Sequence, residues 1–175
     1  MTLTQGVDIG TDGAADIIVS DISSPYTTIN ISGDADATVG GTVAITTATV
    51  DASTATGALL LELGAATHTV TAGTADDTVD FNGNLASTDT ATGGTGDDTL
   101  IATIPASRIS PTISGIETGE LDFDNSGTFA MTNVTGMTSL TLEGGSPHNV
   151  VNIDSSVTNV VLREETGDVA VTLTY

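Results

Sequence analysis

The 175-residue sequence contains no cysteine, no tryptophan and no lysine, and only five aromatic residues. Without cysteine there is no disulfide, so the sequence does not indicate a redox compartment. No apolar run approaches the roughly 20 residues that a membrane-spanning helix needs. The basic start and apolar segment of a secretory signal are also missing, so export would have to use another route.

Basic side chains are almost absent as well. Arg108 and Arg163 face 23 acidic residues, which gives a formal net charge of −21. This charge repels nucleic-acid phosphates and anionic membrane surfaces, so the sequence predicts neither nucleic-acid binding nor membrane insertion. It also makes a compact chain repel itself. Calcium would relieve that repulsion, since it prefers carboxylate and carbonyl oxygens. The alternative is that acidity only keeps the surface soluble, for example in a salty environment.

What the sequence does contain is typical of β-strands. Threonine and β-branched residues dominate, and glycine or Asp-Gly-Ser clusters interrupt them every few residues. Apolar residues alternate with polar ones, which predicts strands with one buried face. The clearest examples are Thr28–Ile31, Leu59–Leu63, Val79–Phe81, Leu140–Leu142 and Val169–Tyr175.

The spacing of these segments predicts the architecture. Gly73–Val79 recurs in similar form as Gly94–Leu100, 21 residues later, and the C-terminal half has one strand about every ten residues. Two short strands per coil of about 20 residues indicate an all-β fold, a parallel β-solenoid (β-roll or β-helix), as a single domain over residues 1–175. Two prolines predict a loop or a weak boundary at residues 105–111. A β-sandwich is the alternative, although it does not require an in-phase repeat.

One motif carries chemistry. Residues 93–101, Gly-Gly-Thr-Gly-Asp-Asp-Thr-Leu-Ile, match the nonapeptide G-G-x-G-x-D-x-U-x at every defined position. Glycines permit backbone angles closed to other residues, Asp98 offers a carboxylate, and Leu100 begins a core-facing strand. Residues 72–80 form a second copy with alanine at two glycine positions, and residues 12–18 form a more degenerate third.

Here the sequence resembles the RTX (repeats-in-toxin) calcium-binding family, whose repeats wind into a parallel β-roll. The resemblance implies Ca²⁺ as the bound ion, held between the turns of neighbouring repeats. It implies a ligand set drawn from Gly73, Asp76, Asp77, Gly94, Gly96, Asp97 and Asp98. The family's ion is shared between turns about 18 residues apart, whereas these copies lie 21 apart. The alternative interpretation is therefore an aspartate-rich turn that binds no metal.

The background composition and the Gly-Ile-Glu-Thr at residues 115–118 look like segments of RTX-exported bacterial S-layer proteins and large adhesins. This likeness implies a non-enzymatic, calcium-binding structural module of an extracellular surface assembly, either an S-layer or a matrix. The expected location is the cell surface, without a cleaved N-terminal signal. A phage virion protein, either a capsid decoration bound to capsid protein or a fibre subunit, is the alternative for a chain that starts at Met1 without a signal.

A third hypothesis is an ice- or surface-binding solenoid, because Thr-x-Thr occurs in several places, such as Thr67–Thr71 and Thr172–Thr174. An ice-binding array would repeat this pair at the same phase in every coil. The sequence does not show such phasing, so threonine is interpreted here as a strand former.

The sequence argues against an enzyme and for self-association. His68 and His148 have dissimilar contexts and are predicted to be strand-surface or turn residues. Glu120, Asp122 and Asp124 alternate with apolar residues, as on a solvated strand face, and not as a glycosidase carboxylate pair. The ends of a solenoid are uncapped sheet edges, so homo-oligomers or lattice neighbours are the expected partners, with the end near Tyr175 covered by a neighbour or folded back.

Overall fold

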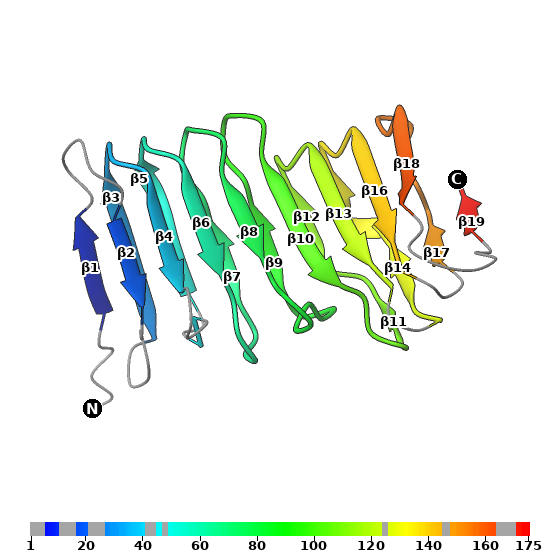
Figure 1. Cartoon of the computed structure of the whole chain (residues 1–175), viewed down its shortest axis with the longest axis horizontal. Helices are drawn as coiled ribbons and strands as arrows, with labels where there is room; N and C mark the ends of the chain where they lie inside the picture. Colours follow the sequence, from blue (N-terminus) through cyan, green and yellow to red (C-terminus); the bar gives the residue numbers. More distant parts are fainter. Residues whose placement is uncertain are drawn as a thin grey trace.

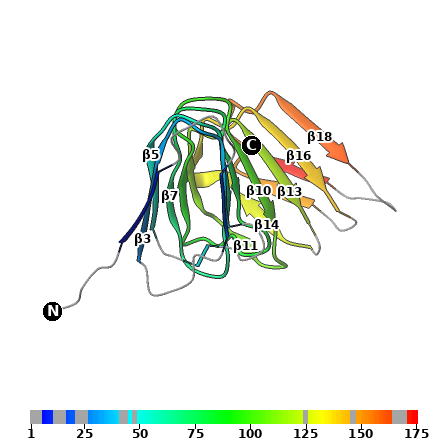
Figure 2. The same cartoon turned by 60° about the vertical axis from the view of Figure 1, so that its left-hand side comes forward.

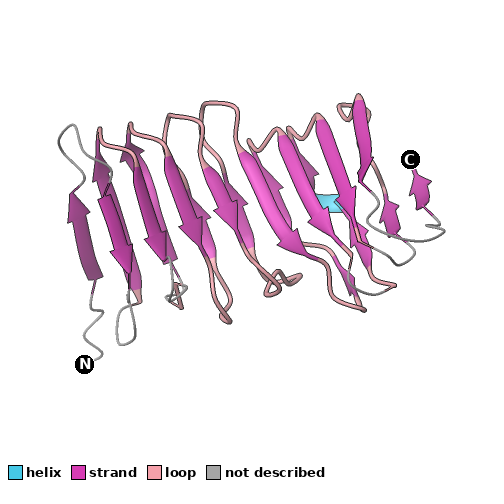
Figure 3. Cartoon of the chain, viewed as in Figure 1, coloured by secondary structure: helices cyan, strands magenta, loops and turns pink. Residues whose placement is uncertain are grey.

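A computed structural model gives the structure of the chain, and it describes residues 6–10, 17–20, 27–40, 45–46, 49–123, 126–144, 148–163 and 171–175. The described part consists of parallel strands stacked side by side along one axis, from the N-terminal end to the C-terminal end (Figure 1). The predicted parallel β-solenoid is confirmed. The one helical element there is the 3-10 turn η1 (Met131–Asn133), seen among the strands in Figure 3.

Two long sheets form opposite walls of the solenoid (Figure 2). The seven-stranded sheet contains, in order, β1 (Gly6–Gly10), β3 (Thr28–Gly33), β5 (Thr49–Ala55), β7 (Thr69–Thr71), β9 (Thr90–Thr92), β12 (Thr112–Ser114) and β15 (Val134–Thr135). The eight-stranded sheet contains β2 (Ile17–Ser20), β4 (Ala37–Gly40), β6 (Leu59–Glu62), β8 (Thr78–Asp80), β10 (Thr99–Thr103), β13 (Thr118–Asp122), β16 (Ser139–Glu143) and β18 (Asn159–Arg163).

The strand register fixes the length of each coil. Thr78 lies beside Thr99, and Thr99 lies beside Thr118, so these coils have 21 and 19 residues. On the other wall, Thr69 lies beside Thr90, again 21 residues later. Every described strand pair is parallel, so residues lie beside their equivalents one coil away and like side chains form columns across the sheet, with one register shift between Asn30 and Ser32 of β3.

The core lies between the two walls and follows the predicted alternation. Ile29 and Ile31, Leu59, Leu61 and Leu63, Val79 and Phe81, and Leu140 and Leu142 are all buried. Branched aliphatic side chains and three phenylalanines fill this space, which is the thin, layered core that a composition poor in aromatics permits. The terminal strand predicted at Val169–Tyr175 is described only from Val171 onward, as β19.

A third wall appears in the C-terminal half, where the sequence predicted only two strands per coil. A four-stranded sheet contains β11 (Arg108–Ile109), β14 (Thr128–Ala130), β17 (His148–Val151) and β19 (Val171–Thr174). It begins inside the proline-containing segment 105–111. Both long sheets continue past that segment, because β10 pairs with β13 and β9 pairs with β12.

Candidate functional site

Three acidic residues occupy the position just before consecutive strands of the eight-stranded sheet. Asp77 precedes β8, Asp98 precedes β10 and Glu117 precedes β13. Each carboxylate accepts a backbone N–H from the equivalent position one coil earlier. The donor–acceptor distances are 2.8 Å from Leu59 N to Asp77 Oδ1, 2.7 Å from Asp77 N to Asp98 Oδ1, and 2.9 Å from Asp98 N to Glu117 Oε2. We call Asp77, Asp98 and Glu117 the carboxylate ladder.

The second carboxylate oxygens of Asp77 and Asp98 differ in their hydrogen bonding. Asp77 Oδ2 accepts the N–H of Gly73 at 2.7 Å, which closes its own turn. Asp98 Oδ2 is buried and has no hydrogen-bond partner. The amide of the adjacent Gly93 donates instead to Ser114 O at 3.0 Å, in the next coil. A buried carboxylate oxygen without a partner is costly, because water no longer solvates its charge.

The electrostatics of the ladder reflect this burial. Desolvation raises the pKa of Asp77, against the hydrogen bonds from Gly73 and Leu59. Desolvation, with smaller contributions from the neighbouring carboxylates of Asp77, Glu117 and Asp76, also raises the pKa of Asp98 to about 6, against the hydrogen bond from Asp77 N. In the described part of the chain the one ion pair formed by an arginine is Arg163 with Glu143, at 2.9 Å. Protein cations therefore do not neutralise the ladder there.

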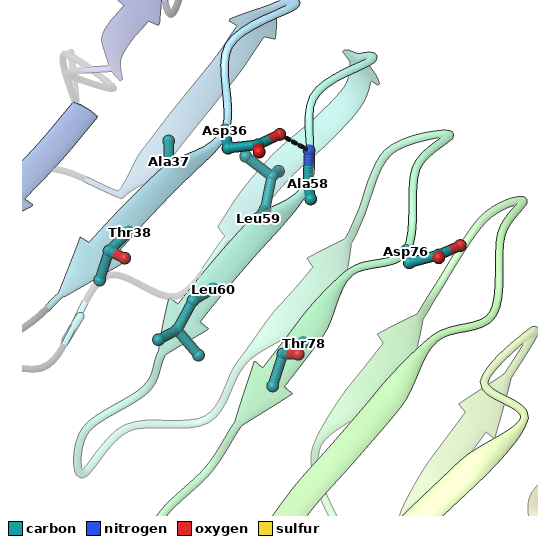
Figure 4. A pocket seen from close by; sticks show the side chains of 8 residues that line it. All are labelled: Asp36, Ala37, Thr38, Ala58, Leu59, Leu60, Asp76 and Thr78. Atoms are coloured by element: carbon teal, nitrogen blue, oxygen red, sulfur yellow. Dashed lines mark hydrogen bonds between the residues drawn. The ribbon is translucent and has the colours of Figure 1, made fainter. Parts of the chain in front are cut away.

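A second acidic row lies outside the ladder, on the exposed side of the same turns. Asp76 and Asp97 are both exposed, and Asp97 N donates to Asp76 Oδ1 at 2.9 Å. Asp36 has a similar role two coils earlier, where its Oδ1 accepts the N–H of Ala58 at 2.8 Å (Figure 4). Between Asp36 and Asp76 the surface has a shallow hollow of about 260 Å³, lined partly by Leu59 and Thr78.

The glycines of the motif have the conformational role that the sequence predicts at two positions. Gly94 and Gly96 adopt φ values of +108° and +132°, which L side chains rarely reach. Gly73 is required for a different reason, since a Cβ there would lie 2.6 Å from the carbonyl oxygen of Ala55.

The seven predicted ligand residues thus lie together in two stacked turns, but their carboxylates divide into two sets. Asp77 and Asp98 face inward, and Asp76 and Asp97 face solvent. In the described residues no three His, Cys, Asp or Glu side chains converge as a ready-made metal cluster. Calcium there would also need backbone carbonyls and water, both of which it accepts readily. The third motif copy, residues 12–18, lies mostly outside the described residues.

Sequence reasoning missed one ladder member, Glu117. A signal for it was present, because Glu117 stands two residues before the buried Gly119 and four before the buried Leu121. This is the same phase that Asp98 has relative to Leu100.

His68 was predicted to be a strand-surface or turn residue; it lies in the connection just before β7, but it is not on the surface. His68 is fully buried, its Nε2 lies 3.0 Å from Gly64 O, and its ring meets Phe81 edge-on. Its backbone N–H donates to Asp89 Oδ1 at 2.9 Å. The hydrogen bonds of His68 and Asp89 satisfy buried polar groups, which explains how an imidazole can occupy this core. The side chain of His148 is outside the described set.

The acidic strand face predicted at Glu120 and Asp122 is present on β13, where both side chains point away from the buried Leu121 and Phe123. Together with Asp80 and Glu143 they line a hollow of about 250 Å³ on the outer face of the eight-stranded sheet. Asp124 lies outside the described residues.

Comparison with known proteins adds no relative: no family model, curated protein or solved structure matches this chain. The described residues also contain no helix with the length and apolar character needed to cross a membrane.

Proposed function

We propose that this chain is a non-enzymatic structural module of a cell-surface assembly, and that its solenoid is stabilised by calcium at the carboxylate ladder. One observation carries the proposal: Asp98 Oδ2 is buried and has no partner. Three further carboxylates surround it in a chain of net charge −21. A bound divalent cation would compensate these charges together.

The chemistry of the donor set suits a hard cation. Every candidate side chain offers carboxylate oxygen, and Asp98 supplies the inward ligand. Asp76, Asp97 and Glu117 can add oxygens from the partly exposed side of the turn, with backbone carbonyls and water completing the shell. Calcium bound there would tie neighbouring coils together and lower the self-repulsion of the folded chain.

The proposal predicts a calcium-dependent thermal stability that disappears in Asp98→Asn. At calcium concentrations near 100 times Kd, binding adds about 2.7 kcal/mol, which corresponds to roughly 5–10 °C in Tm for a chain of this size. Asp98→Asn removes the inward ligand, so its Tm should not respond to calcium. In chelator the variant should be at least as stable as the natural chain, since it also removes the uncompensated buried charge. Thermal melts followed by circular dichroism, with and without calcium, measure both effects.

Asp154→Asn is the matched control, because it removes one exposed carboxylate outside the ladder and should keep the full calcium response. If calorimetry detects no calcium binding and the Tm of the natural chain is unchanged by calcium, the ladder serves only to accept backbone N–H groups. The calcium proposal is then wrong.

The structure also suggests how such a module would meet a neighbour. Leu162 of β18 continues the column of the buried Leu142, yet 48% of its surface is exposed. In the described residues β18 pairs with one strand only, β16. A second copy that adds its own strands to this edge would bury Leu162, so we include homo-oligomerisation at β18 in the proposed function.

A further inference from the structure

Threonine and serine hydroxyls form a regular grid on the outer face of the seven-stranded sheet. Thr69, Thr90 and Thr112 lie side by side on β7, β9 and β12, and Thr71, Thr92 and Ser114 form a parallel second row. We call these six residues the hydroxyl grid. Thr-x-Thr pairs therefore share one phase on β7 and β9, with Thr-x-Ser following on β12, although the pair is not repeated in every coil. The repeat is hard to see in the sequence because the loops differ in length by one residue. Thr69 and Thr90 are 21 residues apart, whereas Thr90 and Thr112 are 22 apart.

The spacing of the grid follows from β-sheet geometry. Neighbouring hydroxyl-bearing residues are about 4.8 Å apart across the strands and about 6.7 Å apart along each strand. The side chains are partly or fully exposed, and Thr92 Oγ1 lies 3.2 Å from Ser114 Oγ. The first row continues in register to Thr49 on β5, and the second row is followed by Thr135 on β15.

The grid is rigidly supported. Val70, Ala91 and Ile113 alternate with its residues and are fully buried beneath it. β-branched side chains in strands have restricted rotamers, so threonine hydroxyls on such a base keep nearly fixed positions. Ordering the surface on binding therefore costs little conformational entropy.

Charge is distributed unequally between the two outer faces of the molecule. Among the described residues, the outer face of the eight-stranded sheet carries five carboxylates, those of Glu62, Asp80, Glu120, Asp122 and Glu143. On the opposite wall the hydroxyl grid carries none, and Asp51 is the nearest acidic residue in its rows. If acidity served solubility alone, the six adjacent positions of the grid would have no reason to lack a carboxylate in a chain with net charge −21.

We propose that the hydroxyl grid binds ice. An uncharged, regular and rigidly supported array of hydroxyls suits a partner that is itself an ordered lattice of hydrogen-bond donors and acceptors. Ice repeats its oxygen atoms at spacings of this size in two perpendicular directions of one crystal plane. A crystalline polysaccharide fits less well, since the grid has no aromatic side chain on which a sugar ring could stack. This inference does not depend on calcium binding.

Incorporation into a growing ice sphere tests the proposal. The dye-labelled full chain, in calcium-containing buffer, should enter the ice several-fold more than an inert protein does. Thr90→Lys places a long charged side chain in the centre of the grid and should reduce incorporation to the level of the inert protein. Thr103→Lys is the matched control on the opposite wall and should behave like the natural chain. Circular dichroism melts verify that each variant is folded, and Thr112→Lys repeats the test if Thr90→Lys does not fold.

Each outcome decides the question. Exclusion of the natural chain from ice overturns the proposal. Equal incorporation of the natural chain and of a folded Thr90→Lys variant places binding elsewhere, which also overturns it. If the chain sediments with cellulose or chitin powder and stays out of ice, the partner is a solid polysaccharide and the ice assignment is wrong.

Discussion

At the scale of single residues, the two adjacent aspartates of the 94–98 turn face opposite ways: Asp98 is buried and Asp97 is exposed. Two adjacent aspartates, Asp97 and Asp98, both looked like ligands. The alternation that buries Leu100 and Ala102 extends back to Asp98 and places it inside, with Asp97 outside. The missing partner of Asp98 Oδ2 could not be predicted, because it depends on Gly93 donating to Ser114 in the next coil.

The raised pKa of Asp98 predicts a pH-dependent stability in chelator. Its folded pKa, about 6, lies above the unfolded value of 3.8, so the folded chain binds this proton more tightly. The stabilisation is present below about pH 4 and is lost as the pH rises through about 6. By 1.36 kcal/mol per pKa unit, discounted for solvent screening, it amounts to about 1–2 kcal/mol.

Urea unfolding of the natural chain and of Asp98→Asn at several pH values measures this difference. The free energy of unfolding of the natural chain, relative to the variant, should fall between pH 4 and pH 6. Parallel pH profiles for the two proteins would show that Asp98 titrates normally in the folded chain.

At the scale of strands and turns, the period-two pattern predicted strands such as β3, β6 and β8, because one face of each is buried. Of the third wall, β19 lies within the predicted strand Val169–Tyr175, whereas β11 was not predicted. β11 has only two residues, and its single buried residue, Ile109, creates no alternation to detect. The turns were predicted from glycine, and Gly96 shows how strict that requirement is.

Gly96→Ala should destabilise the chain by about 2–4 kcal/mol, measured by urea unfolding in chelator. Its φ of +132° is nearly closed to alanine, and the new Cβ would collide with the carbonyl of Ala75 in the preceding coil. Gly83→Ala is the control, since a Cβ there meets nothing within 4 Å, and its effect should stay within about 0.5 kcal/mol. Equal stability of the two variants would contradict the observed backbone of the 94–98 turn.

At the scale of the whole molecule, the parallel architecture was predictable because the sequence repeats, whereas the distribution of charge was not. Which wall a residue joins depends on the lengths of all the loops before it. The carboxylates on the outer face of the eight-stranded sheet and the hydroxyl grid could therefore be identified only from the strand register.

The proposed homo-oligomerisation at β18, which among the described strands pairs with β16 alone, can be tested directly. The natural chain should form larger species with increasing concentration in sedimentation velocity experiments with calcium, and Leu162→Asp should remain monomeric, because it places a charge in the surface to be buried. Val161→Asp is the control on the same strand, since its side chain alternates to the other face, and it should associate normally. A natural chain that stays monomeric at all concentrations would rule out assembly through this edge.

Because the coils stack in parallel and in register, the number of coils can change without altering the structure of each coil. Asp77 and Asp98 occupy the same column, so the 21 residues from Thr78 to Asp98 form one complete layer. Removing or duplicating such a layer would join Asp77 to Thr99, or Asp98 to Thr78, with every column kept. The molecule would shorten or lengthen by about 4.8 Å with its two faces unchanged. Gene segments that encode one layer can thus be lost or copied in evolution without redesign of what remains, and the span of the protein can be adjusted in uniform steps.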